Sequence, residues 1–277
     1  PPSKVFFAYA SQPPLRAETM REAVTATRNR GIDAFGWESM LIGGRVLVDT
    51  ITDSLRASDA CVAEVSSFNA NVLFEAGYAL ARGKQLFFAL DETDQSANAA
   101  WREFEMIETI GRIDYGGNSE RLAQSLSEHL SQPLVPLVEA MLTGGRPREA
   151  NAIFSPSVPI SFNAAERLQA LLNRRTDLKV IASNDDLGLS QLSHYTKDIY
   201  RSSAAIFHLL ASNRVGAATY NARASLLAGI AHGFDLPVKL VAESGYRCAL
   251  DYRDLFFAYA TTEQLTRHVD QWLSALP

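Results

Sequence analysis

The chain has 277 residues, 47% hydrophobic and 21% charged, which is enough apolar material for two ordinary domains with packed cores. Its 26 basic and 31 acidic residues give a net charge of −5, which argues against a nucleic-acid binder that relies on bulk positive charge. No apolar run approaches the roughly 20 residues that a transmembrane helix needs, so we expect no membrane partner.

The first half alternates short apolar runs with helical patterns. A strand-like run opens at Val5 and is followed by an amphipathic helix over 16–30 and a second strand over 32–35. A run in 56–83 leads through a loop into a small-residue helix, and the strand 86–90 and a helix over 119–130 follow. Continuous apolar runs of this length are typical of parallel strands that are buried on both faces.

The second half repeats this order. The segment RSSAAIFHLLASNRVGAATYNARASLLAGIAHG (201–233) resembles RASDACVAEVSSFNANVLFEAGYALARG (56–83), and this alignment pairs Gly233 with Gly83 and Ser225 with Glu75. The flanking elements match as well, namely a strand at 153–155, helices over 163–175 and 262–275, and a strand over 179–182. We therefore expect an internal duplication.

Strand–helix alternation in each repeat predicts an α/β protein of two tandem, doubly wound, mostly parallel Rossmann-like domains. The expected boundaries are 1–131 for copy one, 132–151 for a linker rich in Pro and Gly, and 152–277 for copy two. Ligands of such sheets bind at the carboxyl ends of the strands. In copy one this edge is predicted to hold 9–14, 66–71 and 91–98.

The most informative motif is N-A-N-V-L-F-E-A-G-Y-A-L-A-R-G-K, residues 69–84. Asn69 or Asn71 is a plausible helix N-cap, Glu75 falls early in the helix, and Gly83 is a C-cap. Small residues such as Gly77 are expected to let the helix lie close to its sheet. The structural explanation for Glu75 is a favourable interaction with the helix dipole, worth about 0.3–1 kcal/mol without any catalysis.

This motif resembles the nucleoside 2-deoxyribosyltransferase superfamily and its TIR-like relatives, whose fold is flavodoxin-like. The opening Phe6-Phe7-Ala8-Tyr9-Ala10-Ser11 and the block from Asp49 to Asp59 are similar to the same group. The resemblance implies that Glu75 is the catalytic carboxylate. It implies substrate contacts near the sugar or base from Tyr9, Ser11, Asp59 and Asn71, with Asn69 as a further substrate-binding residue. Trp37 and Arg45 fall in the region where TIR-like proteins have a mobile loop over the pocket.

The implied reaction is cleavage of an N-glycosidic bond. Its oxocarbenium-like transition state is stabilised or attacked by a carboxylate at the anomeric carbon. A nicotinamide leaving group needs no proton, whereas a neutral base usually needs a general acid. One glutamate therefore favours an NAD glycohydrolase, with NAD as substrate and no metal or other cofactor, and the resemblance implies an effector module of a bacterial defence system.

Two alternatives stay open. One is a non-catalytic tandem module that senses a nucleotide or mediates assembly within a larger protein, and the other is a nucleoside 2-deoxyribosyltransferase. Copy two has no acidic residue at the position aligned with Glu75, so we expect it to be regulatory, to bind a ligand or to mediate oligomerisation. A homo-oligomer is a further expectation, because TIR-like sites are often completed by a neighbouring subunit.

The cysteines and the start of the chain indicate its setting. Cys61 and Cys248 lie far apart and suggest neither a disulfide framework nor a zinc site, so we expect reduced thiols in the cytoplasm. The chain begins Pro1-Pro2-Ser3 without an initiator Met. We therefore expect a piece of a longer protein, without a signal peptide, whose other domains are candidate partners.

Overall fold

The computed structural model describes residues 4–40, 47–107, 110–132, 136–182, 191–247 and 250–276. Arg45 and Cys248, both named from the sequence, lie outside the described residues.

Copy one forms one parallel five-stranded sheet in the order β2-β1-β3-β4-β5. This is the flavodoxin-like order, in which strands are added first on one side of β1 and then, from β3 onward, on its other side. Its elements are β1 (Lys4–Ala8), α1 (Pro14–Asn29), β2 (Asp33–Gly36), α2 (Leu47–Arg56), β3 (Ala60–Glu64), α3 (Ala70–Ala81), β4 (Gln85–Leu90), α4 (Gln95–Glu103), β5 (Arg112–Asp114) and α5 (Ser119–Leu130).

Copy two forms a second parallel sheet in the order β10-β9-β8-β6-β7. Read from β7, the strands follow the same order as in copy one, so the two halves share one topology. This confirms the predicted α/β class. The elements are β6 (Ala152–Phe154), α7 (Asn163–Arg174), β7 (Lys179–Ile181), α8 (Leu192–Arg201), β8 (Ala204–Leu209), α9 (Ala217–Gly233), β9 (Val238–Glu243), β10 (Phe256–Tyr259) and α10 (Thr262–Ser274).

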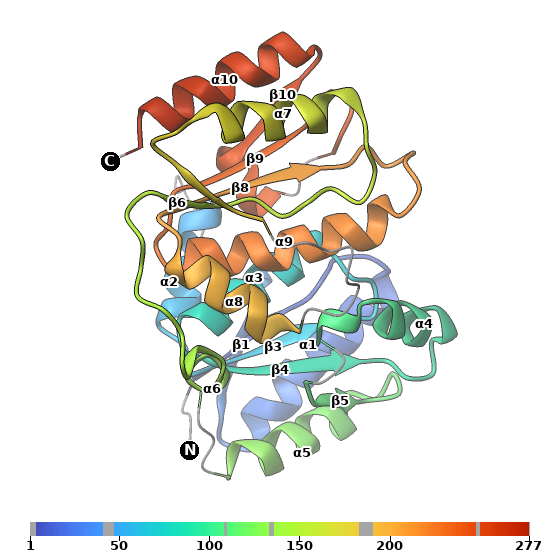
Figure 1. Cartoon of the computed structure of the whole chain (residues 1–277). Coiled ribbons are helices and arrows are strands. Elements are labelled where there is room, and N and C mark those ends of the chain that lie inside the picture. The colour runs from blue at the N-terminus through green and yellow to red at the C-terminus, as the bar shows by residue number, and fades with distance from the viewer. Residues whose placement is uncertain are drawn as a thin grey trace.

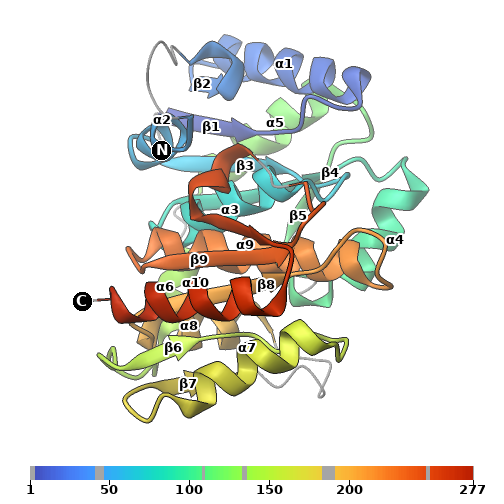
Figure 2. The same cartoon turned by 90° about the horizontal axis from the view of Figure 1, so that it is seen from above.

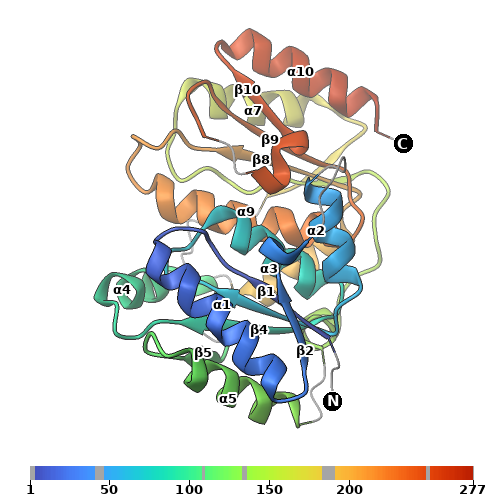
Figure 3. The ribbon, with the colours of Figure 1, turned by 180° about the vertical axis from the view of Figure 1, so that it is seen from behind.

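The two sheets and their helices stack in layers (Figure 1). Helices α1 and α5 cover the outer face of sheet one, and α7 and α10 cover the outer face of sheet two (Figure 2). Between the sheets, α3 and α9 share a single apolar core that joins Phe6 of β1 to Phe207 of β8. The copies also touch where α2 contacts the 3₁₀ segment Leu250–Leu255 (Figure 3).

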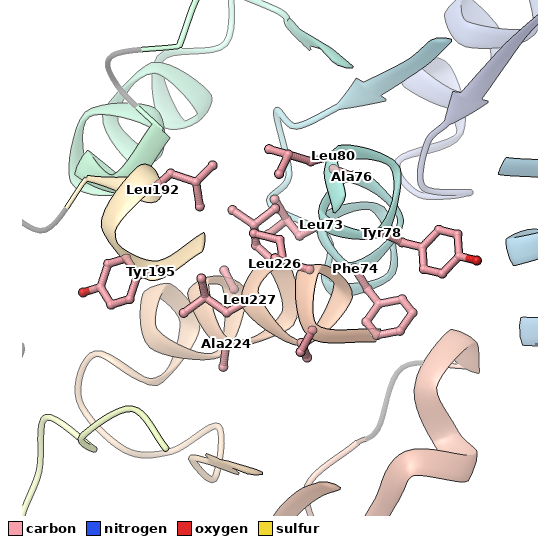
Figure 4. Packing of buried hydrophobic residues seen from close by; sticks show 14 of the residues in the cluster. Leu73, Phe74, Ala76, Tyr78, Leu80, Leu192, Tyr195, Ala224, Leu226 and Leu227 are labelled. Carbon is pink, nitrogen blue, oxygen red and sulfur yellow. The ribbon is translucent and has the colours of Figure 1, made fainter. Parts of the chain in front are cut away.

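Helices α3 and α9 pack backbone against backbone through glycines. A Cβ on Gly77 would lie 2.1 Å from the carbonyl oxygen of Leu226, and one on Gly229 would lie 2.0 Å from that of Phe74. Residues further along α3 contact residues further along α9, so the two helices run in the same direction. Leu226 lies at their contact (Figure 4). Gly77 therefore makes room for copy two, and the expectation that it brings α3 close to its own sheet is wrong.

The ends of these helices show how the copies correspond. Gly83 follows α3 with a φ of +70°, and Asp235 follows α9 with a φ of +60°. The residue that follows Gly83 and the residue that follows Asp235 each donate a backbone N–H to a carbonyl of the last turn of the helix before them. Gly83 thus corresponds to Asp235, and its pairing with Gly233 is wrong. Comparison of the sequences misses this match because aspartate is among the residues that tolerate the left-handed conformation.

The corrected correspondence also changes the counterpart of Glu75. Counting back from the helix ends places Gly229 opposite Gly77 and Leu227 opposite Glu75, so Ser225 is not the replacement. The extra residues of copy two lie before this point, because α9 has 17 residues and α3 has 12. Copy two still has no carboxylate here, since Leu227 is a buried core residue.

The segment predicted as a linker contains a helix. Residues Leu137–Leu142 form α6, whose Val138 and Met141 are buried in the shared core. The connection therefore packs against the molecule instead of running free between the copies. Among the described residues, no helix has the length and apolar character that crossing a membrane requires.

Candidate functional site

Glu75 is a carboxylate inside the apolar layer between the two sheets. It lies in the second turn of α3 and is 4% exposed, with buried residues on either side of it in the sequence. Burial raises the pKa of the Cys61 thiol on β3, and the negative charge of Glu75 raises it further. Glu75 therefore lies close to the inner face of sheet one, in surroundings from which water is largely excluded.

Three other predicted residues gather at the carboxyl edge of sheet one. Asn69 is the N-cap of α3, and its side-chain oxygen accepts the N–H groups of Asn71 at 2.9 Å and Val72 at 3.3 Å. Asn71 is half-buried in the first turn, and Ser11 is exposed in the loop after β1. Capping engages the Asn69 carbonyl, so its amide group is the part that can contact a ligand.

Tyr9 and Trp37 form a pair: the Tyr9 ring lies on the opposite face of the sheet from Glu75, and Trp37 packs against the cores on both faces. The Trp37 indole N–H donates to the backbone carbonyl of Tyr9 at 3.1 Å, and their rings lie 6.4 Å apart. The Tyr9 ring belongs to the core under α1 and packs on Gly36. Burial, with the charge of Glu38, raises the Tyr9 pKa to about 12. The structure therefore does not bring the Tyr9 side chain to Glu75.

Asp59 lies at the other end of β3 from the expected ligand edge. It precedes the strand, its carboxylate accepts the Lys4 backbone N–H at 3.0 Å, and it is exposed. Because it stands at the amino end of a parallel sheet, it is separated from Asn69 by the length of the strand. Its observed role is to tie β1 to the start of β3.

A second buried carboxylate, Glu64, ends β3 on the face toward α1. Its Oε1 accepts the Ser66 N–H at 3.1 Å and the Tyr115 hydroxyl at 3.2 Å, and it lies 3.8 Å from the Arg16 guanidinium. Arg16 also pairs with Asp94 at 2.8 Å. Burial raises the pKa of Glu64. This network joins the loops after β3, β4 and β5 and fixes the carboxyl edge of the sheet.

Sequence reasoning missed this network. The available signal was a charged residue, Glu64, within an otherwise apolar run, since glutamate is rarely buried without partners. Its partners Arg16 and Tyr115 come from distant parts of the chain and could not be assigned from spacing.

Copy two has a buried pair at the place of Glu64 and Tyr115, but a histidine stands where copy one has the glutamate. His208 is the second-last residue of β8, on the face toward α7, and its Nε2 lies 2.7 Å from the hydroxyl of Tyr259, the residue that ends β10. Both the strand positions and the tyrosine match Glu64 and Tyr115 of copy one. Burial lowers the pKa of His208 to about 4, so the imidazole is neutral at pH 7.

Within the described residues, no group of three or more His, Cys, Asp or Glu side chains is placed to hold a metal ion. A scan against protein-family models finds no match, and a search of curated proteins finds no significant match.

Proposed function

We propose that copy one is an N-glycosidase that cleaves the nicotinamide–ribose bond of NAD or a related nucleotide, with Glu75 as the carboxylate at the anomeric carbon. The observation that carries the proposal is the burial of Glu75, at 4% exposure, on a helix that begins at the carboxyl edge of sheet one. A carboxylate held in place away from water stabilises a developing positive charge more strongly than a solvated one.

The reaction needs little else from the protein. The bond between C1′ and the nicotinamide nitrogen breaks, and its electron pair leaves with the now neutral nicotinamide. Glu75 stabilises the cationic sugar, and water then adds to C1′ and releases a proton. Because the leaving group needs no general acid, a single carboxylate is sufficient.

The experiment compares two isosteric variants at high protein concentration. Purified chain is incubated with NAD and, separately, with a deoxynucleoside plus a free base, and the products are separated by chromatography. We expect nicotinamide release that Glu75→Gln abolishes. Glu64→Gln is the matched control, because Glu64 is also a buried carboxylate but lies on the other face of the sheet. Thermal unfolding of both variants checks that they fold.

The outcomes separate the three functions. Nicotinamide release that persists in Glu75→Gln refutes the role of Glu75. Base exchange without hydrolysis indicates a deoxyribosyltransferase. No product with either substrate, from a folded chain, contradicts catalysis by this chain and favours a non-catalytic nucleotide-binding module.

A further inference from the structure

Copy two has a cavity of about 910 Å³ at the carboxyl edge of its sheet. Its walls come from the segments after β8, β9 and β10 and from the first residues of α7 and α10. The volume falls within the range of small-molecule sites, and the carboxyl edge is where parallel α/β sheets bind ligands. Figure 1 shows the β8–α9 connection and the start of α7 on the same side of the molecule. The residues that line it and enter the argument below are Phe162, Asn163, Ala164, Arg214, Glu243 and Tyr259.

One wall presents a cation in a fixed position. The Arg214 guanidinium makes two hydrogen bonds to Glu243, at 2.7 and 3.0 Å, and lies 4.0 Å from the centre of the Phe162 ring. Both charged side chains keep about three tenths of their surface exposed. Arg214 is therefore held by one edge and one face, and its Nη1 makes no hydrogen bond to any residue that the structure describes. A planar guanidinium is well suited to bind a phosphate.

A second wall presents backbone donors. Helix α7 begins after Phe162, whose side chain cannot cap it, and Asn163 and Ala164 of its first turn line the cavity. Helix α10 also begins here, but its Thr261 and Gln264 form a complete capping box. Of these two helices, α7 is the one whose N-cap residue offers its first N–H groups no side-chain acceptor, and such an end binds anions.

Tyr259 also lines the cavity. Its hydroxyl lies 2.7 Å from Nε2 of His208, which is 2% exposed and whose Nδ1 has no hydrogen-bond partner among the residues that the structure describes. In copy one, the equivalent pair Tyr115 and Glu64 has the Arg16 side chain beside it. The two copies share a fold, but they differ in how this edge is filled.

We propose that the cavity of copy two binds a nucleoside phosphate. The phosphate lies between the N-terminus of α7 and Arg214, and the ribose hydroxyls donate to Glu243. A carboxylate accepts hydrogen bonds from sugar hydroxyls, while the helix end and the guanidinium, whose charge Glu243 balances, supply N–H donors to the phosphate. This site is separate from Glu75 and does not depend on the reaction proposed for copy one.

The test measures binding of AMP, ribose 5-phosphate and adenosine to the full chain by titration calorimetry. We expect AMP to bind at least about 10-fold more tightly than adenosine, and ribose 5-phosphate to bind detectably, because the phosphate makes charge-assisted hydrogen bonds. Asn163→Asp places a negative charge at the helix end, where it favours folding but repels phosphate, and should weaken AMP binding about 10-fold or more. Arg214→Ala should weaken it similarly.

Two controls make the result decisive. Gln169→Glu adds the same charge to α7 at a residue that does not line the cavity and should change AMP affinity less than about 2-fold. Glu75→Gln should leave AMP binding intact, which separates this site from copy one. The proposal is overturned if AMP does not bind at millimolar concentration, if adenosine binds equally well, or if Asn163→Asp has no effect on AMP binding.

Discussion

Replacing Gly229 with alanine tests the packing of the two copies. The new methyl group would lie 2.0 Å from the carbonyl oxygen of Phe74, whereas real Cβ atoms essentially never come within 3.0 Å of a heavy atom to which they are not bonded. Helices α3 and α9 would therefore have to separate by about 1 Å, and rotation of a side chain cannot relieve the clash because the obstacle is backbone. Without the clash, glycine to alanine within a helix would stabilise the protein by about 1 kcal/mol.

We therefore expect a net loss of at least about 2 kcal/mol in the free energy of unfolding, measured with urea, because the overpacking cost must exceed the gain in helix propensity. Gly111→Ala is the matched control, since a Cβ at Gly111 meets no atom within 4 Å and its φ is not positive. That variant should be unchanged or slightly more stable. A Gly229→Ala protein as stable as the unmodified chain would refute the close approach of α3 and α9.

Two further predictions concern single side chains. His208 is neutral in the fold, with its pKa lowered to about 4 by burial and by Arg214 against the opposing effect of Glu243. The unfolded chain takes up a proton near pH 6.5, so the stability due to this group is complete above that pH and falls by up to about 3 kcal/mol as the pH drops to 4. His208→Gln should show a correspondingly smaller loss in urea unfolding across this range, and an unchanged pH dependence would contradict the buried neutral imidazole. Asn69→Ala should lower the free energy of unfolding in urea by about 1 kcal/mol, because two N–H groups of α3 lose their acceptor. Asn173→Ala, at an exposed position in α7, is the control and should lower it by less than about 0.5 kcal/mol. Equal effects of the two substitutions would count against the cap.

The local elements could be predicted from the sequence because their signals are local. Apolar runs too short for helices indicated buried parallel strands, and the helix over 119–130 begins and ends as expected. Asn69 was one of two candidate caps, and only the backbone geometry of the helix start selects it over Asn71. The repeated order of elements was enough to predict two copies of one α/β fold.

The tertiary structure decided what depends on which surfaces meet. Sequence similarity aligned Gly233 with Gly83, but the conformation after each helix aligns Asp235 instead. The role of Gly77 depends on a carbonyl in copy two that no local pattern identifies. The Glu64 network and the cavity beside Arg214 are assembled from side chains on separate strands and helices. Periodicity shows that a residue is buried, but the identity of its neighbour is settled only when segments distant in sequence pack together.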